Sequence, residues 1–240
     1  MHCKSFYDSN SIVALGGSNY DAKHNIANQK CYFENNNISY LSFTNNYIGN
    51  IGYLHFNKIH YILKAMKVVT DGTWLLWVDR DILFTNMNMC AFTNSIPNIK
   101  KDLIVPQNLN NGMFLIRKTC WSYKFLERWL SYINHSCIRR PMYDMMAFIM
   151  SINSLSYNFT FNCHNWTGYA YFMENNLKNT NNIEIIDTKL PLYPHIHFLG
   201  SNTHLSVRKC YKETLNAWIT LSNNTCPKNM SIASCTKLTH

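Results

Sequence analysis

Residues 74–86, WLLWVDRDILFTN, constrain the fold more strongly than any other part of this sequence. The first five, residues 74–78, are all aromatic or aliphatic, and so short an apolar run is more typical of a buried strand than of a helix. Asp79 and Asp81 follow at once, and the sequence is apolar again at residues 82–84. Burying two like charges beside a hydrophobic core is unfavourable unless a cation joins them.

The two aspartates allow two interpretations. In an extended chain their side chains project to the same side, with Cβ atoms roughly 6–7 Å apart. Hard carboxylate oxygens suit Mg²⁺ or Mn²⁺, which predicts a divalent metal site from which Arg80 points away. The alternative is a turn at the end of a strand with two solvated aspartates, and this stretch alone leaves both interpretations open.

The length and composition indicate one large domain. A chain of 240 residues with 47% hydrophobic and 14% aromatic residues can bury a sizeable core. We expect a single domain over residues 1–221 and a polar tail over 222–240. No stretch approaches the roughly 18–20 uninterrupted apolar residues of a membrane span, and residues 1–10 lack a signal-peptide pattern. We therefore expect a soluble protein in the cytoplasm, or in the Golgi lumen if the chain is a domain cut from a membrane anchor.

The formal net charge of +9 favours an anionic partner. The basic residues are scattered and form no Lys/Arg-rich run or nucleic-acid recognition motif, so we expect a phosphorylated small molecule and no nucleic acid.

The nine cysteines form no CxxC pair, which argues against a zinc knuckle. Their odd number and wide spacing are compatible with free thiols in a reducing compartment. Asn-x-Ser/Thr sequons occur, for example at Asn37 and Asn158, but asparagine is so abundant that many would arise by chance.

The order of the predicted elements favours an α/β fold. A strand at residues 11–15 ending in Gly16-Gly17, a helix at 23–36 and a strand at 38–43 suggest a βαβ unit with a parallel sheet. A helix at about 53–69 precedes the strand at 74–78. Asp79 and Asp81 thus lie at the carboxyl end of a parallel strand, where open α/β sheets bind ligands.

Further elements follow in the second half. We expect strands at 102–106, 112–117 and 183–186, and helices at 120–134, 142–152 and 205–221. The helix at 120–134 carries a continuous apolar stripe, which predicts core packing and not a ligand site. The helix at 142–152 has Asp144 near its start, and residues 191–200, PLYPHIHFLG, carry two histidines.

Three motifs occur in a recognisable order: Asp-x-Asp after a strand, an Asn-Gly turn before an apolar strand in NNGMFLIR (residues 110–117), and His-Phe-x-Gly at residues 197–200. This order resembles GT-A-fold glycosyltransferases, and in particular the galactosyltransferase family of fungal α-1,2-galactosyltransferases and plant xyloglucan xylosyltransferases. The resemblance covers residues 12–218. It implies a Rossmann-like GT-A domain with a mostly parallel central sheet flanked by helices.

The resemblance also implies an activity: the retaining transfer of a hexose or pentose from a nucleotide diphosphate sugar, usually a UDP-sugar, to a glycan or glycoconjugate hydroxyl. In this family Asp79 would touch the ribose or the metal, and Asp81 and His197 would ligate the metal. A nitrogen ligand among oxygens favours Mn²⁺, with Mg²⁺ as the other candidate. His195 is interpreted as a packed or solvated histidine.

The implied nucleotide-sugar site comprises Leu15, Gly16, Lys58, Asp79, Asn111, Gly112 and Gly200. Leu15 and Gly16 match positions whose backbone meets the nucleotide. Lys58 is expected either to meet a phosphate or to be an exposed lysine at a helix start. Asn111 and Gly112 match the turn below the donor sugar. Asp144 aligns with an acidic position near the reacting sugar carbon, so Asp144 and Asn111 are the expected catalytic residues.

The sequence departs from the family pattern twice. Met145 follows Asp144 where the family often has Gln, and residues 201–204, SNTH, replace a common Cys-Lys-Pro-Cys, so Arg208 or Lys209 would have to supply the missing charge. Two alternatives therefore stay open: a GT-A transferase of another subfamily with an inverting outcome, and a non-catalytic module that binds a nucleotide or glycan. The donor sugar, the acceptor and the oligomeric state do not follow from the sequence.

Overall fold

The structure is a computed structural model. It describes residues 12–17, 23–43, 51–87, 100–106, 109–136, 138, 143–156, 182–186, 195–197, 205–222 and 226. Within these residues no helix has both the length and the apolar character needed to cross a membrane.

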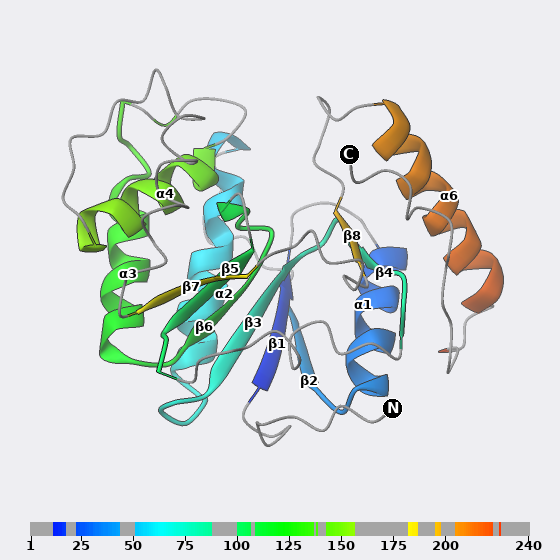
Figure 1. The fold of residues 1–240 in the computed structure, drawn as a ribbon, viewed down its shortest axis with the longest axis horizontal. Helices are drawn as coiled ribbons and strands as arrows, with labels where there is room; N and C mark the ends of the chain where they lie inside the picture. The colour runs from blue at the N-terminus through cyan, green and yellow to red at the C-terminus, as the bar shows by residue number, and fades with distance from the viewer. Residues whose placement is uncertain are drawn as a thin grey trace.

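A six-stranded sheet forms the centre of the molecule, in the order β2-β1-β3-β6-β5-β7 (Figure 1). Its strands are β1 (Ile12–Gly17), β2 (Ser39–Phe43), β3 (Trp74–Asp79), β5 (Leu103–Pro106), β6 (Met113–Arg117) and β7 (Ile183–Ile186). Strand β1 pairs in parallel with β2 and β3, and β5 pairs in parallel with β7. Strand β6 is antiparallel to both β3 and β5, so it is the strand that opposes the others. The predicted α/β class with a mostly parallel sheet is confirmed.

Helices cover both faces of this sheet (Figure 1). One face carries α1 (Lys23–Asn35) and α6 (Leu205–Ser222), and the other carries α2 (Asn57–Met66), α3 (Cys120–Ser131) and α4 (Tyr143–Ser156). A 3₁₀ helix, η2 (Ile51–Phe56), leads into α2, so the helix expected over 53–69 is shorter and begins later than predicted. Because β1, α1 and β2 follow one another and β1 and β2 are parallel, the predicted βαβ unit is confirmed.

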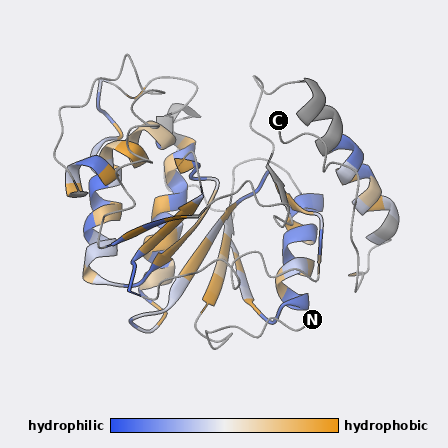
Figure 2. Cartoon of the chain, in the orientation of Figure 1, coloured by the Kyte–Doolittle hydropathy of each residue, from blue (hydrophilic) through white to orange (hydrophobic). Residues whose placement is uncertain are grey.

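Strand β3 is buried on both sides. Its residues alternate between two cores: Trp74, Leu76 and Val78 pack on the α1 side, whereas Leu75 and Trp77 pack on the side of α2, α3 and α4. Burial on both faces explains why this strand is uninterruptedly apolar in sequence. Figure 2 shows the same contrast, with hydrophobic central strands and a largely hydrophilic α1.

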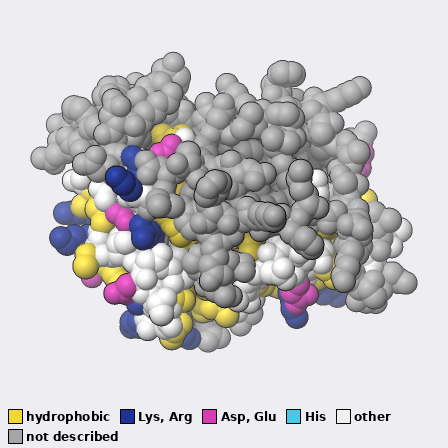
Figure 3. Space-filling model, turned by 60° about the horizontal axis from the view of Figure 1, so that its bottom comes forward, with side chains coloured by type: hydrophobic (Ala, Val, Ile, Leu, Met, Phe, Trp, Pro, Cys, Tyr) yellow, Lys and Arg dark blue, Asp and Glu magenta, His cyan; other side chains and the backbone are white. Residues whose placement is uncertain are grey.

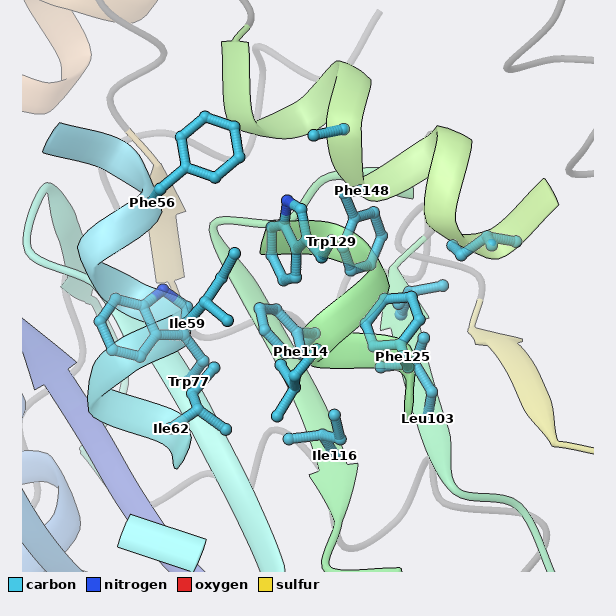
Figure 4. Close-up of a cluster of buried hydrophobic side chains, with 14 of the residues drawn as sticks. Phe56, Ile59, Ile62, Trp77, Leu103, Phe114, Ile116, Phe125, Trp129 and Phe148 are labelled. Atoms are coloured by element: carbon cyan, nitrogen blue, oxygen red, sulfur yellow. The ribbon is translucent and has the colours of Figure 1, made fainter. Parts of the chain in front are cut away.

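The larger core is aromatic. Phe125 and Trp129 of α3, Phe148 of α4 and Phe114 of β6 pack with ring centroids 4.7–5.9 Å apart (Figure 4). All four side chains are fully buried. The apolar stripe predicted for the helix at 120–134 is thus confirmed as core, although α3 ends at Ser131.

A second, two-stranded sheet follows the aspartates. Strand β4 (Ile82–Phe84) pairs antiparallel with β8 (His195–His197), and Ile82 lies opposite His197. This pairing brings the backbone of the late histidine segment next to the residues that follow Asp81.

Cys31 of α1 forms a disulfide with Cys226, and their Cα atoms are 5.3 Å apart. The expectation of free thiols is therefore wrong for this pair, whereas Cys120 has an exposed free thiol. Sequence spacing could not find the pair because 195 residues separate the two cysteines, and only the packing of α6 against α1 returns the chain to that point. Cys226 lies in the predicted polar tail, which is covalently attached to the domain here.

Charged side chains of both signs share the surface in Figure 3. On the described part of that face, Lys and Arg side chains lie interspersed with Asp and Glu. The described part of this face therefore offers no continuous basic surface, despite the net charge of +9.

Candidate functional site

Lys58 joins three segments at the end of β3. It is the second residue of α2, and its side chain is only 4% exposed. Its Nζ lies 3.0 Å from Asp79 Oδ1 and 2.9 Å from Asp144 Oδ2, and it donates to the carbonyl oxygen of Asn111 at 3.2 Å. The alternative of an exposed lysine at a helix start is wrong. The structure instead assembles Lys58, Asp79, Asn111 and Asp144, which the sequence placed in one site, into one contact network.

Asp79 is held at the carboxyl end of β3. The indole Nε1 of Trp77 donates to Asp79 Oδ1 at 2.6 Å, which fits the two-residue period of the strand. The backbone N–H of Asp79 donates to the carbonyl oxygen of Gly112 at 2.7 Å. The Asp79 side chain is still 25% exposed, so part of its carboxylate faces outward from this network.

Asp144 and Asn111 form the other end of the network. Asn111 Nδ2 donates to Asp144 Oδ2 at 2.9 Å, and Trp129 Nε1 donates to the Asp144 carbonyl oxygen at 2.9 Å. Asp144 lies in the first turn of α4, where the helix dipole favours a negative charge. The predicted pair of catalytic residues is therefore in direct contact.

The contacts within this network shift the pKa values of Lys58 and Asp144. Burial alone would lower the pKa of the Lys58 ammonium, but the carboxylates of Asp144 and Asp79 raise it above its ordinary value. Burial alone would raise the pKa of the Asp144 carboxyl, but the charges of Lys58 and His55, with hydrogen bonds from Lys58 and Asn111, lower it below its usual range. Both groups are consequently ionised at neutral pH.

Asp81 does not continue the strand. Strand β3 ends at Asp79, and the chain turns at Arg80 and Asp81 before β4 begins. The extended backbone expected from Asp79 to Asp81 is therefore wrong. Because the chain turns at these residues, the two-residue period of a strand does not apply to the Asp81 side chain. Arg80 is buried, and its positive charge acts on the hydroxyl of Tyr40 in β2.

The backbone segments that carry the predicted metal ligands Asp79, Asp81 and His197 lie next to one another. Asp79 ends β3, and Asp81 lies in the turn that follows. The backbone of His197 lies opposite Ile82, and the structure does not describe the His197 side chain. Within the described residues no three His, Cys, Asp or Glu side chains form a ready metal cluster. The donor set of two carboxylates and an imidazole nevertheless fits a divalent cation such as Mn²⁺.

Gly16 also has a packing role inside the protein. A Cβ atom at Gly16 would meet the hydroxyl of Tyr40 and lie 3.1 Å from Gln29 Oε1, so the glycine leaves room for these two side chains. The Leu15 side chain is fully buried in the core. Gly112 N–H donates to Asn110 Oδ1 at 2.7 Å within the predicted turn. Gly200 lies outside the described residues.

Sequence reasoning missed the polar residues of α1 that hold the aspartate segment. Gln29 Nε2 donates to the carbonyl oxygens of Asp79 at 2.9 Å and Ile82 at 3.0 Å. Asn28 Nδ2 donates to the Phe84 carbonyl oxygen at 3.0 Å, and Phe84 N–H donates back to Asn28 Oδ1 at 2.7 Å. The available signal was the pair Asn28-Gln29 on the helix face that also carries Cys31 and Phe33, where apolar residues were expected.

Comparison with known proteins gives partial sequence matches. No family model matches the chain. Probable glycosyltransferase 6 of Oryza sativa subsp. indica is 31% identical over 88 residues, which is 31% of this chain and 18% of that protein. Galactomannan galactosyltransferase 1 of Cyamopsis tetragonoloba is 30% identical over 90 residues, or 32% of this chain and 20% of that protein. The matches thus span about a fifth of the length of these curated relatives.

A solved structure matches most of the fold. It is a glycosyltransferase involved in the glycosylation of the major capsid of PBCV-1, with a TM-score of 0.57 and 13% sequence identity. The likeness covers 86% of this chain and 98% of that one. At this identity the likeness concerns the fold, and it agrees with the GT-A class expected from the sequence. This chain is therefore similar to glycosyltransferases in its fold, and in part of its sequence to plant members of that class.

Proposed function

We propose that this chain is a metal-dependent, retaining glycosyltransferase. It transfers a hexose or pentose from a nucleotide diphosphate sugar, with UDP-sugars as the first class to test, to a hydroxyl of a glycan or glycoconjugate. The observation that carries this proposal is the buried Lys58–Asp79–Asp144–Asn111 network at the carboxyl end of β3. Charged groups collected at this edge of an α/β sheet are typical of a ligand site.

In this proposal Asp79, Asp81 and His197 hold Mn²⁺, or Mg²⁺ in its place. A divalent cation bound there would stabilise the negative charge on the diphosphate leaving group. The backbone of Leu15 and Gly16 meets the nucleotide, and the turn at Asn111 and Gly112 lies below the donor sugar.

Asp144 and Asn111 contact the donor sugar near its reacting carbon. Because Lys58 keeps Asp144 ionised, this carboxylate presents a fixed negative charge and can accept a hydrogen bond from a sugar hydroxyl. An ammonium carries three hydrogens, and Lys58 already contacts three protein groups, so a phosphate contact would have to replace one of these. The residue thus acts on the donor chiefly through Asp79 and Asp144.

The test is the substitution Asp81→Ala. Donor hydrolysis and transfer should fall by at least about 100-fold in the presence of Mn²⁺, because a metal ligand is lost. The matched control is Asp71→Ala, since Asp71 is 92% exposed and makes a surface ion pair with Lys118. Retention of full hydrolysis and transfer by Asp81→Ala would overturn the mechanism. A panel of nucleotide sugars should begin with galactose donors, given the name of the Cyamopsis relative.

A second candidate function is a module that binds a nucleotide or glycan without turnover. Met145 after Asp144, and residues 201–204 without a lysine, favour this alternative. Calorimetry with UDP, with and without Mn²⁺, combined with a donor-hydrolysis assay separates the two: binding without turnover supports the module. If transfer occurs, the anomeric configuration of the product, measured by NMR, distinguishes a retaining from an inverting enzyme.

A further inference from the structure

We propose that Gln29 and Tyr40 are positioning residues for the aspartate turn, defined as residues 79–82. They fix the backbone on either side of Arg80-Asp81 and so set where the two aspartates lie. This inference rests on the proposed function, because that function gives the two aspartates their metal-binding role. The hydrogen bonds that support it do not depend on any ligand.

Gln29 bridges the two ends of the aspartate turn. Its side chain is fully buried, and its Nε2 donates one hydrogen bond to the Asp79 carbonyl oxygen and another to the Ile82 carbonyl oxygen. The turn leaves the central sheet at Asp79 and enters the small sheet at Ile82. One side chain therefore holds together the points at which the turn begins and ends.

The chemistry of these contacts requires a primary amide. Two carbonyl oxygens accept hydrogen bonds and cannot donate, so the side chain between them has to supply two hydrogens without bringing a buried charge. The remaining Oε1 accepts a hydrogen bond from the Tyr40 hydroxyl at 2.8 Å. Both hydrogens and the oxygen of the Gln29 amide are thus used, and Tyr40 fixes which end of the amide faces the turn.

The surroundings of Tyr40 fit this donor role. Burial raises the pKa of its hydroxyl to about 12, so the group keeps its proton at physiological pH. The missing Cβ at Gly16 leaves the space in which the Tyr40 hydroxyl and Gln29 Oε1 meet. A glycine of β1, a tyrosine of β2 and a glutamine of α1 consequently form one support beneath the aspartate turn.

Asn36 supplies a matched control on the same stretch of chain. It lies directly after α1, it is buried, and its Nδ2 donates to the carbonyl oxygens of Tyr32 and Met87. Like Gln29, it is a buried amide that donates to a backbone carbonyl oxygen of a distant segment, here that of Met87. Met87, however, lies beyond the aspartate turn and beyond β4, so loss of the Asn36 amide leaves the turn contacts intact.

The experiment compares Gln29→Met with Asn36→Leu, which both replace a buried amide with an apolar side chain of similar size. In the metal-free proteins, hydrogen exchange at residues 79–84 should accelerate by about tenfold in Gln29→Met and stay unchanged in Asn36→Leu. In UDP calorimetry, Gln29→Met should raise the Mn²⁺ concentration needed for half-maximal nucleotide binding by about tenfold. Tyr40→Phe should shift both quantities in the same direction by about threefold.

Equal behaviour of Gln29→Met and Asn36→Leu in exchange at residues 79–84 would overturn the inference. If Gln29→Met does not fold, Tyr40→Phe, which removes a single oxygen atom, decides the question by the same comparison. If the native chain binds no nucleotide, the proposed function fails, and the exchange measurement on the metal-free chains still decides whether Gln29 positions the turn.

Discussion

A single buried lysine organises the charges of the site. Lys58 lies between Asp79 and Asp144, and Trp77 lies beneath it with the ring centroid 5.9 Å from Nζ. A buried charge is tolerated only when it is paired and hydrogen-bonded, and here one cation compensates two carboxylates. The excess negative charge is then available at the exposed part of Asp79, next to the turn that carries Asp81.

This arrangement makes acid stability depend on Asp144. The pKa of Asp144 in the folded chain is below its unfolded value of 3.8, so its contribution to stability is present above pH 3.8 and is lost as the pH falls through the folded value. Asp144→Asn should therefore be less stable than the native chain at neutral pH, and the difference should shrink below about pH 4. Urea unfolding measured from neutral to acid pH checks this expectation. A difference that stays constant across the range would contradict it, and Asp71→Asn should show no difference at any pH.

The family resemblance predicted that Lys58, Asp79, Asn111 and Asp144 lie together, but not which contacts they make. Lys58, Asn111 and Asp144 were expected near the donor from their motifs, but the bond from Asn111 to Asp144 depends on how α4 packs on the sheet. The extended backbone expected at Asp81 was wrong because a turn at Arg80-Asp81 ends the strand. Gln29 was missed because it binds backbone carbonyl oxygens, which every residue has, and Tyr40 was missed because its partner is the Gln29 side chain on another element.

At the scale of elements, helices α3 and α1 bury different kinds of side chain. Helix α3 buries Phe125, Leu126 and Trp129 against the aromatic core, and its amphipathic pattern made it predictable. Helix α1 is largely hydrophilic and uses Asn28 and Gln29 to hydrogen-bond the segment from Asp79 to Phe84. The apolar periodicity still predicted where α1 lies. Only the structure shows which backbone groups its buried polar side chains bind.

The amino-terminal end of α3 provides a test of element stability. The side chain of Thr119 accepts a hydrogen bond from the Ser122 N–H at 3.3 Å and caps the helix. Thr119→Ala should lower the free energy of unfolding by about 1 kcal/mol, whereas Thr119→Ser keeps the cap and should change it by less than about half of that. Urea denaturation of the three chains measures both values. Equal losses in the two variants would show that the methyl group, and not the cap, matters.

At the scale of the whole molecule, the alternation of strands and helices was enough to predict the α/β class. The disulfide was not predictable, because Cys31 and Cys226 meet only through the final packing of α6 on α1. The same holds for the pairing of β4 with β8, which connects residues more than a hundred positions apart. Long-range contacts of this kind leave no local pattern in a single sequence.

The disulfide should contribute strongly to global stability. In the chain-entropy description, closing a loop of this length stabilises the folded state by up to about 5 kcal/mol. Cys226→Ser should therefore lower the urea midpoint, and reductant should lower the midpoint of the native chain to a similar value. The control is Cys120→Ser, which removes the exposed free thiol and should leave the midpoint unchanged. A native midpoint that is insensitive to reductant would contradict the expected contribution.

The same bond has a topological consequence. Cys31 and Cys226 close a covalent ring that contains Lys58, Asp79, Asn111 and Asp144. A protease that cuts the chain once anywhere inside this ring produces two pieces that stay joined through sulfur, so a nicked molecule keeps all four residues in one covalent assembly until the bond is reduced.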